Sequence, residues 1–566
     1  MMKKTYIKGK DEALEVSIEK MQAQLKSLDF DIEEVLWLNP VSNIYSVNIR
    51  DKNCPLLFTN GKGSSKNACL ASALGEFFER LNCNYFFADY YLGQSIAQAD
   101  FVHYPSEQWF SLDDEKDAMG MPKGLLNEEL WSFYNPEQQL TPESLIDTNS
   151  ANTQRGICAL PFVRHADQVT TWFPVNIIGN LYVSNGMSAG NSKMEARTQA
   201  VSEIFERYIK NRIIAERISL PLIPEHILDM YPKVLEAKHE LEQEGFIIEI
   251  KDASLGGVYP VIAITMIEAG TGRSLVSFGA HPGFEVALDR TMTELLQGRR
   301  LDSLDGFQTP CFDDEAVADP VNLETHFIDS SGIVSWEFLR NEPDYAFSDW
   351  DGKGQNTQEE FDWLCERIHE EGNDIFIMDY EELGVYACRV LVPGMSEIYP
   401  PDDLVWENNN AGMDVREAIL AKNKTEEDCE ALMEKLDDLN ADDQHPVAAL
   451  IGLPADKDSI FSDLRIAELI TLLALRVQDN ERIQEGCEWL LHFRQINPQR
   501  LKTYQCINTL LQFDGMAKYG ASLKKLYGKA VLNDALALID GEDIFPLESD
   551  WKMHELLLDG YKKIQI

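Results

Sequence analysis

Two stretches of the chain combine a Gly/Ser-rich loop with a closely spaced pair of glutamates. Residues 59–80 read TNGKGSSKNACLASALGEFFER, and residues 184–207 read SNGMSAGNSKMEARTQAVSEIFER. Both open on Ser or Thr followed by Asn-Gly, and both end on Glu-x-x-Glu-Arg after an alanine-containing helical segment. Because composition alone does not explain two ordered matches of this length, we interpret them as two halves of one site.

The glutamates of each stretch are spaced to share one face of a helix. Glu76 and Glu79 lie three residues apart, which on a helix places their β-carbons about 5–6 Å from each other. Glu203 and Glu206 repeat this spacing, and Glu195 extends them into a polar stripe along the same helix. An isolated pair of this kind is usually a solvated surface pair, but carboxylates brought together inside a cleft require a cation.

Magnesium with a polyphosphate would suit these carboxylates. Mg²⁺ is usually held by one or two carboxylates, with substrate phosphates completing its octahedron. A Gly/Ser-rich turn that opens a helix also offers backbone N–H groups and the positive end of the helix dipole to an anion. Neither loop matches GxxxxGK(S/T), and Gly61-Lys62-Gly63 lacks the third glycine of a dinucleotide fingerprint. The sequence therefore predicts a nucleotide site of another kind.

A third segment, VALDRTMTELLQGRR, carries a related pattern. It places Arg290, Glu294 and Gln297 on one helix face. An arginine in this position could hold a phosphate through two parallel hydrogen bonds. The alternative is a surface helix with ordinary i,i+4 charge pairing.

A different class of chemistry is suggested by Gly186-Met187-Ser188-Ala189-Gly190, which matches GxSxG. This motif follows the strand-like run NIIGNLYVS and precedes a helical segment, the context expected of a hydrolase nucleophile elbow. The first stretch has no equivalent serine, and a serine hydrolase mechanism would give the four paired glutamates no role. A serine hydrolase using Ser188 is therefore the less favoured alternative.

The elements around these motifs indicate an α/β or α+β fold followed by a helical region. Strand-like runs such as IYSVNIR, FIIEI, YPVIAITMI and VYACRVLV alternate with amphipathic helical stretches up to about residue 410. A charged, breaker-containing stretch follows, and then LRIAELITLLALRVQDNERIQEGCEWLLHF, which is helical with a break at 478–480. We expect a domain over 1–410, a charged linker over 411–450, and an all-α, tetratricopeptide-like interaction or dimerisation domain over 451–566.

Composition excludes several function classes. With 50 Lys and Arg against 95 Asp and Glu, the formal charge of −45 disfavours direct binding of nucleic acid. It is typical of a solvated surface, and the alternative is a surface that suits a cationic partner. No run approaches the roughly 18 apolar residues of a membrane span, and no signal peptide is recognised. The ten cysteines form no CxxC pair, and the histidines show no metal-binding spacing. We expect a cytoplasmic protein whose metal, if any, is bound by carboxylates.

Taken in order, these motifs resemble the YcaO family. The resemblance is carried by the two ExxER helices, the SNGMSAGN loop, AxxRxxxExxQxR, and the stretches FGAHPGFEVALDRTMTELLQGR, THFIDSSG and VPGMSEIYP. It implies an internally duplicated ATP-binding fold, unlike that of kinases, in which glutamates hold Mg²⁺ between the protein and the ATP phosphates.

The resemblance also assigns roles to individual residues. The metal ligands it implies are Glu76, Glu79, Glu195, Glu203 and Glu206. The nucleotide-contacting positions it implies are Lys10, Ser17, Ser72, Asn191, Glu195, Arg207 and Arg290. Among these, Glu76, Glu203 and Arg290 are the catalytic candidates, because Mg²⁺ held by the glutamates and the arginine itself would offset the charge that develops during phosphoryl transfer.

The activity implied by the resemblance is Mg²⁺-dependent ATP hydrolysis. Family members that modify peptides use ATP to activate a backbone amide, and azoline-forming members commonly end in a PxPxP tail. This chain ends in HELLLDGYKKIQI, so azoline formation is not expected. The resemblance instead implies an accessory factor for β-methylthiolation of a small-subunit ribosomal protein, a homodimer that works with a methylthiotransferase. The alternative is a non-catalytic adaptor that binds ATP and docks that enzyme.

Overall fold

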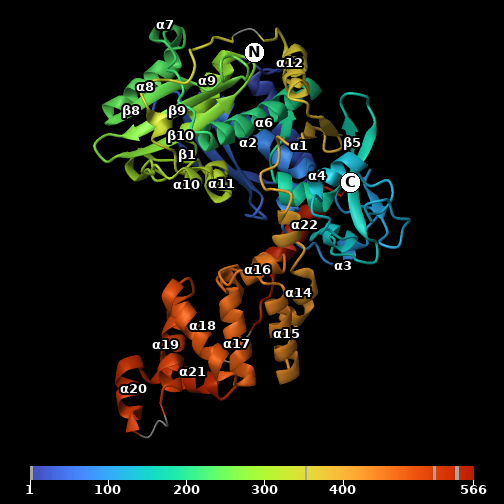
Figure 1. Cartoon of the computed structure of the whole chain (residues 1–566), viewed down its shortest axis with the longest axis vertical. Coiled ribbons are helices and arrows are strands. Elements are labelled where there is room, and N and C mark those ends of the chain that lie inside the picture. The colour runs from blue at the N-terminus through green and yellow to red at the C-terminus, as the bar shows by residue number, and fades with distance from the viewer. Residues whose placement is uncertain (1–3, 351–352, 514–517, 542–546, 566) are drawn as a thin grey trace.

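The computed structural model describes residues 4–350, 353–513, 518–541 and 547–565. An upper part of mixed strands and helices is joined to a lower part made of helices (Figure 1). Every ladder between the named strands is antiparallel. The upper part is therefore α+β, one of the two classes that the sequence allows.

The first sheet supports the first glutamate-bearing helix. Its strands β1 (Ile32–Leu38), β2 (Tyr45–Asp51) and β3 (Phe58–Gly63) lie in chain order. Helix α2 (Lys66–Asn82) packs on this sheet and against α1 (Leu14–Ser27). The apolar face of α2 closes a buried core with the inward-facing residues of β2, which leaves its acidic residues on the opposite side.

Two further sheets support the second glutamate-bearing helix and the arginine helix. The largest has the order β4 (Gln108–Phe110), β5 (Ile157–Arg164), β11 (Phe376–Tyr380), β12 (Tyr386–Leu391) and β7 (Met187–Gly190), with β6 (Thr170–Pro174) paired to β5. The third has the order β10 (Arg273–Ala280), β9 (Val261–Glu268) and β8 (Phe246–Asp252). Helix α6 (Lys193–Ala215) packs on β12 and β10, and α9 (Phe284–Leu295) packs on β10. The strands predicted over 44–50, 246–250, 259–267 and 385–392 are confirmed as β2, β8, β9 and β12.

Shorter elements complete the upper part. They are α3 (Gln94–Ala97), α4 (Glu128–Tyr134), α5 (Val175–Ile177), α7 (Glu225–Leu228), α8 (Pro232–Gln243), α10 (Asp314–Ala318), α11 (Pro320–Ile328), α12 (Thr357–Glu370), α13 (Asp403–Trp406), the 3-10 turns η1 (Tyr85–Phe87), η2 (Pro142–Leu145), η4 (Leu301–Ser303) and η5 (Glu337–Leu339), and the π-helical turn η3 (Ile178–Tyr182).

The lower part begins earlier than the sequence suggests. The stretch 411–450, expected as a charged linker, holds α14 (Met413–Leu420), α15 (Glu426–Asp438) and α16 (Val447–Leu450). Although α15 is rich in charge, its apolar residues recur at helical intervals and enter the same core as the helices that follow. Those helices are α17 (Ile466–Val477), α18 (Asn480–Phe493), α19 (Pro498–Leu511), α20 (Gly520–Tyr527) and α21 (Lys529–Ile539), with the turn η6 (Ile460–Ser462). The predicted break at 478–480 is confirmed, whereas the tetratricopeptide character stays a prediction.

The last helix, α22 (Lys552–Lys562), returns to the upper part (Figure 1). Leu557 and Tyr561 are buried in the core that also contains Phe87. The Tyr561 hydroxyl donates a hydrogen bond to the carbonyl of Val102, and the Lys563 ammonium lies 4.6 Å from the ring centroid of Phe30. Although the sequence groups α22 with the helical domain, its apolar face belongs to the upper core.

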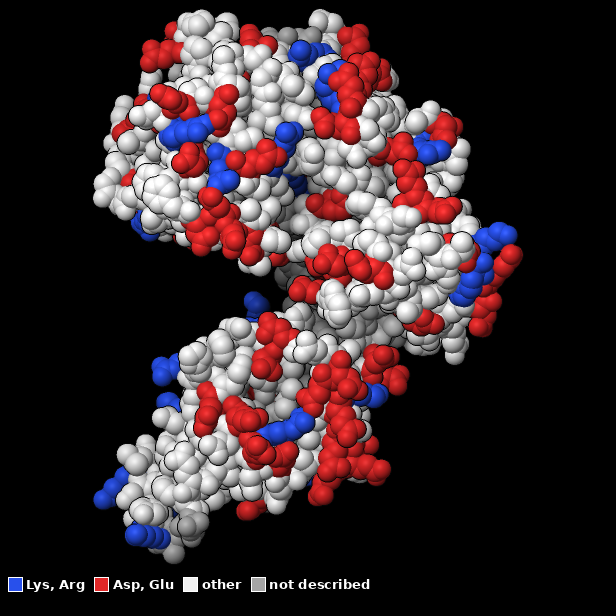
Figure 2. Space-filling model, in the orientation of Figure 1, with Lys and Arg blue, Asp and Glu red and all other residues white. Residues whose placement is uncertain are grey.

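The surface reflects the acidic composition. Acidic side chains are distributed over much of the face shown in Figure 2, and they gather in the lower part over α15. Within the described residues, no helix combines the length and the hydropathy that crossing a membrane would require.

Candidate functional site

The two glutamate-bearing helices begin in the same way. Strand β3 leads into α2 and strand β7 leads into α6. The N-cap hydroxyl of Ser65 accepts the N–H of Ala68 at 3.2 Å, and that of Ser192 accepts the N–H of Glu195 at 3.1 Å. The duplicated sequence therefore builds duplicated strand-loop-helix units.

Glycine is required where each strand approaches its helix. A β-carbon on Gly63 would lie 2.7 Å from the backbone nitrogen of Cys69, and one on Gly190 would lie 2.9 Å from that of Ala196. Either contact is shorter than real β-carbons tolerate, so a larger residue would push the strand away from the helix.

In each helix the first glutamate of the Glu-x-x-Glu pair forms an ion pair with the arginine four residues later. Glu76 lies 3.3 Å from Nη2 of Arg80, and Glu203 forms the same i,i+4 ion pair with Arg207. Each guanidinium also stacks on a ring, Arg80 at 4.5 Å from the centroid of Tyr85 and Arg207 at 4.4 Å from that of Phe327. In the described part of the chain, Nη1 of both arginines is buried without a hydrogen-bond partner.

The carboxylates of the two helices come close enough to influence one another. Burial raises the pKa of Glu79 well above its ordinary value, although the adjacent Arg80 opposes this shift. The negative charges of Glu203, on the other helix, and of Glu76 raise the pKa of Glu79 further. The structure thus crowds acidic groups from α2 and α6, as the sequence predicts for a shared site.

Partly buried cations surround these carboxylates. Lys62, on β3, is paired with Glu294 of α9. Burial lowers the pKa of Lys62 to about 8, against the attraction of Glu206. Burial also lowers the pKa of Arg290, whose charge interacts with Glu206 and Glu203.

Lys210 lies one turn beyond Glu206 on α6. Its ammonium donates to the carbonyl of His326 at 2.8 Å, and burial lowers its pKa to about 8. We call the assembly of these four carboxylates and five cations the charged cluster; its members are Glu76, Glu79, Glu203, Glu206, Lys62, Arg80, Arg207, Lys210 and Arg290.

Four of the remaining predicted residues meet at the start of α6. The Lys10 ammonium lies 3.2 Å from Oε1 of Glu195. The amide of Asn191 donates to the same carboxylate at 3.1 and 3.0 Å, and the hydroxyl of Ser17 donates to Oδ1 of Asn191 at 2.7 Å. Residues from the N-terminus, α1 and the second loop thus form one network.

The negative charge of Glu195 is already balanced in this network by the ammonium of Lys10. Burial raises the pKa of its carboxyl, but Lys10 and the backbone N–H of Asp11 outweigh burial and hold the pKa below its ordinary value. It precedes Glu203 by eight residues, which is about 12 Å of helix rise. The network and the charged cluster are linked through His281, because burial, Arg290 and Lys10 together hold its pKa well below the ordinary value.

The two serines singled out from the sequence, Ser72 and Ser188, lie in different environments. Ser72 is exposed on α2, one turn before Glu76, and its nucleotide contact stays a prediction. Ser188 is buried within β7, where it pairs with Cys388 of β12. The run 176–184, expected as a strand, is instead helical in α5 and η3. The nucleophile-elbow context predicted for Ser188 is therefore wrong, because the serine lies inside a ladder and not at a strand-to-helix turn.

The donor set fits magnesium only together with phosphates. Within the described residues, no group of three or more His, Cys, Asp or Glu side chains is arranged to hold a metal by itself, and Glu76 and Glu203 are engaged by arginines. Mg²⁺ prefers oxygen ligands and commonly takes only one or two carboxylates beside the phosphates of its substrate. The five cations of the cluster are in turn suited to the negative charge of a polyphosphate.

Sequence reasoning did not assign Lys62, Arg80 or Lys210 to the site. The duplication contained a signal for Arg80, because it occupies the position in the first stretch that Arg207 occupies in the second. No local signal distinguishes Lys62 and Lys210 from solvated lysines, since their burial arises from the packing of β3 against α9 and of α6 against α11.

Comparison with known proteins gives consistent matches along the chain. A family model described as YcaO cyclodehydratase, ATP- and Mg²⁺-binding, matches residues 60–396, and a model described as YcaO cyclodehydratase C-terminal domain matches residues 412–566. The chain is 50% identical over 581 residues to the ribosomal protein S12 methylthiotransferase accessory factor YcaO of Escherichia coli, covering 100% of this chain and 98% of that relative. It is 48% identical over 583 residues to an uncharacterised protein of Haemophilus influenzae, covering 100% and 99% of the two chains.

Two solved structures are more distantly similar. A heterocyclase in complex with substrate and cofactor has a TM-score of 0.47 and 16% identity, covering 71% of this chain and 56% of the heterocyclase. The structure of YcaO from Methanopyrus kandleri bound with AMPPCP and Mg²⁺ has a TM-score of 0.42 and 18% identity, covering 70% of this chain and 95% of that protein.

Proposed function

Since the chain belongs to the YcaO family, we propose that it binds ATP with Mg²⁺ in the charged cluster and hydrolyses the nucleotide. One observation carries this proposal. Two duplicated Glu-Arg helices bring four carboxylates together with Lys62, Lys210 and Arg290, whose pKa values burial lowers. Such a mixture of carboxylates and buried cations suits a metal-bound polyphosphate better than either a metal or an anion alone.

Each residue has a proposed role in this arrangement. Glu76, Glu79, Glu203 and Glu206 would hold Mg²⁺, with Glu195 supporting them from the start of α6. When bound, Mg²⁺ neutralises charge that develops on the phosphates during transfer. Lys62 and Arg290 would bind phosphate oxygens, and the free Nη1 groups of Arg80 and Arg207 would donate to them. Lys10, Ser17 and Asn191 would contact the nucleotide beyond its phosphates, and Ser72 is the remaining candidate contact.

ATP titration and steady-state hydrolysis test the proposal directly. Replacing Glu203 or Glu76 by Gln keeps the side-chain shape but removes one charge, so we expect Mg²⁺-dependent ATP binding and turnover to fall at least tenfold. Glu216→Gln is the matched control, because Glu216 ends the same helix and its side chain is 53% exposed, outside the charged cluster. Equal activity in all three variants would contradict the proposed site. ATP binding without turnover in the unaltered protein would favour the adaptor alternative.

The physiological role follows from a relative and is proposed on that basis. The relative from E. coli is named as an accessory factor of a methylthiotransferase for a small-subunit ribosomal protein. We propose the same role here, with the acidic surface (Figure 2) attracting a cationic partner and the helical part mediating self-association or docking. Deleting the gene and measuring the mass of that ribosomal protein tests the role, and sedimentation equilibrium tests the proposed homodimer. An unchanged methylthio content would exclude the accessory function.

A further inference from the structure

A cavity lies one helical turn beyond the charged cluster, at the C-terminal end of α2. Cys83 belongs to its wall and follows Glu79 by four residues, about 6 Å of helix rise. We call it the Arg389 pocket, and the titratable residues that line it are Cys83, Tyr85, His103, Asp147, Tyr380 and Arg389.

Arg389 is a buried cation without an acidic partner in this pocket. The residue is 5% exposed and lies within β12. Its Nη2 donates to the carbonyl of Val183, whereas its Nε has no hydrogen-bond partner. Its strongest electrostatic neighbours are Cys83 and Tyr380, which are neutral at pH 7 because burial raises the pKa of each. A guanidinium that is removed from water in this way is stabilised by an anion.

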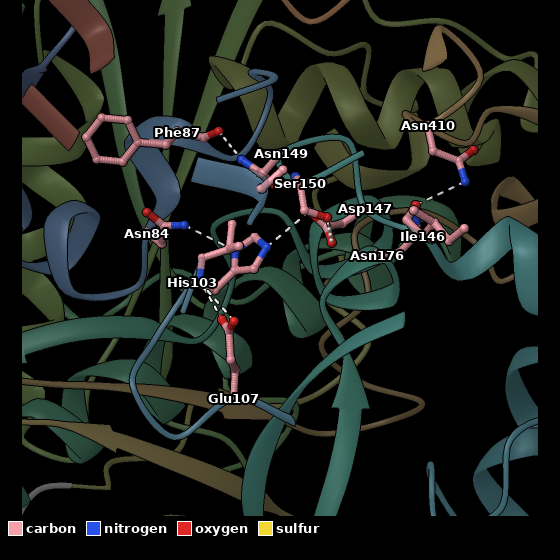
Figure 3. A network of polar contacts seen from close by, with 12 residues as sticks. Asn84, Phe87, His103, Glu107, Ile146, Asp147, Asn149, Ser150, Asn176 and Asn410 are labelled. Carbon is pink, nitrogen blue, oxygen red and sulfur yellow. Dashed lines mark hydrogen bonds and ion pairs between the residues drawn. The ribbon is translucent and has the colours of Figure 1, made fainter. Parts of the chain in front are cut away.

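The one carboxylate in the wall of the pocket, Asp147, contacts His103 and Ser150 instead of Arg389. Its Oδ1 lies 3.1 Å from Nε2 of His103, and the carboxylate accepts the backbone N–H of Ser150 at 2.9 Å and the Ser150 hydroxyl at 2.8 Å. Figure 3 shows Asn84 on the other side of the imidazole, with its amide nitrogen 3.1 Å from Nδ1 of His103. These partners satisfy Asp147, so it does not compensate Arg389.

The backbone around Arg389 is held in an unusual conformation. The wall includes Ile178 and Gly179 of the π-helical turn η3, a rare form that is frequently found at functional sites. Val183 follows that turn with φ 51° and ψ −114°. A β-branched residue at positive φ is strained, and the surrounding structure must offset that strain. This strained residue supplies the carbonyl that fixes the guanidinium.

The pocket is small, and its remaining wall combines apolar residues with four asparagines, Asn84, Asn149, Asn176 and Asn409. It offers about 40 Å³ to the centres of water-sized molecules, room for roughly three waters at about 10–15 Å³ each. Leu160, Val175 and Ile178 line it beside Arg389. Burial raises the pKa of Cys83 to about 12, so its thiol is not a nucleophile at neutral pH. These dimensions fit a carboxylate with one or two further carbons and exclude a triphosphate.

We propose that the Arg389 pocket binds a small carboxylate, with the carboxylate group against the guanidinium of Arg389 and the carbon chain against Leu160 and Val175. The place of this ligand in catalysis rests on the proposed function. The charge of Arg80 acts both on Arg389 in the pocket and on Glu79 in the charged cluster. The bound carboxylate would therefore lie beside the proposed ATP site, where it would be an acceptor substrate or the carboxylate group of a larger acceptor substrate.

Saturation-transfer NMR on the full chain without ATP tests this binding. Acetate is the probe for a free acid. N-acetylglycine is the probe for the C-terminal carboxylate of a peptide, of which only the carboxylate and the α-carbon would enter the pocket. We expect a saturable signal from at least one probe and at least tenfold weaker binding in Arg389→Gln. Arg416→Gln is the matched control, because Arg416 is also buried but belongs to α14 in the lower part; binding in this variant should stay within twofold.

A second variant closes the pocket and leaves every charge in place. A β-carbon on Gly179 would meet only Nδ2 of Asn409, at 3.7 Å, so Gly179→Leu is expected to fold and to fill the space. Loss of probe binding in this variant supports the proposal even if Arg389→Gln does not fold. Absence of a saturable signal in the unaltered protein, or undiminished signals in folded variants, would overturn it. ATP titrations of the same samples separate this result from the proposed function, because probe binding without ATP binding would refute only the latter.

Discussion

Lys62 and Lys210 give the proposed ATP binding a pH dependence that follows from their burial. Burial lowers the pKa of each ammonium from 10.5 to about 8. A triphosphate placed beside them would favour the charged form and return both pKa values toward 10.5. Near pH 8 each lysine is about half deprotonated in the free protein, so ATP binding would take up about half a proton at each, or about one in total.

The magnitude and the sign of the effect can be worked out from these values. Below pH 8 both lysines are protonated with and without ATP, so neither changes the affinity with pH. Between pH 8 and the higher pKa of the complex, the lysines must be protonated on binding, and the affinity falls as pH rises. If the pKa of one lysine returned fully from about 8 to 10.5 on binding, the linked free energy of ATP binding would be about 3.4 kcal/mol. Because the side chain of Lys62 is 28% exposed, solvent screens part of this interaction, and we expect about half of that free energy.

Isothermal titration calorimetry at pH 8 in two buffers of different ionisation enthalpy measures this uptake. The observed enthalpies should differ by the ionisation difference multiplied by about one proton. Lys62→Met should reduce the uptake to about half a proton, whereas Lys123→Met, which alters a lysine that is 66% exposed, should leave it unchanged. Identical enthalpies in both buffers would refute the reasoning, as would full uptake in Lys62→Met.

Three further predictions concern the packing that supports the site. Leu557→Ala should lower the free energy of unfolding by about 2–5 kcal/mol in urea denaturation, because Leu557 is fully buried in the upper core, whereas the neighbouring Leu556→Ala should change it little; equal effects would argue against docking of α22. Gly75→Ala should stabilise α2 by about 0.5–1 kcal/mol, since no atom lies within 4 Å of the added β-carbon, and a loss of stability would show that the helix is packed differently. Burial lowers the pKa of His103, but Asp147 outweighs burial and raises it. Burial raises the pKa of Asp147, but His103 and Ser150 outweigh burial and lower it. The stability that His103 contributes is therefore lost as pH rises through its folded pKa, and the stability that Asp147 contributes is lost as pH falls through its folded pKa. Asp147→Asn should therefore cost most between pH 4 and 6.5, and a loss of stability in urea that is independent of pH would contradict this pairing.

Several features of this protein are determined locally and could be predicted from the sequence. The Glu76 and Glu203 ion pairs lie at i,i+4 on helices that begin with an N-cap serine, so spacing alone defines them. The strand runs that became β2, β8, β9 and β12 were recognised because apolar and β-branched residues dominate them. The motif Glu-x-x-Glu-Arg, repeated in two comparable segments, predicts that the four carboxylates of the cluster belong to one site.

Other features were misread because charge and small-residue patterns are ambiguous over short distances. The many acidic residues of α15 suggested a linker, yet its buried face forms part of the lower core. The apolar run 176–184 fitted a strand by composition, but it packs as the helical turns α5 and η3. In both cases the surrounding core, and not local propensity, decided the outcome.

Only the tertiary structure decided which distant groups meet. The pairing of Lys10 with Glu195, the return of α22 to the upper core, and the hydrogen bond from Arg389 to the carbonyl of Val183 each join segments separated by more than 180 residues. A side chain's charge can be read from its type, but its desolvation and its partners depend on how helices and sheets pack. For that reason the sequence by itself determined the carboxylates of the cluster, whereas folding determined which cations and which small pocket lie beside them.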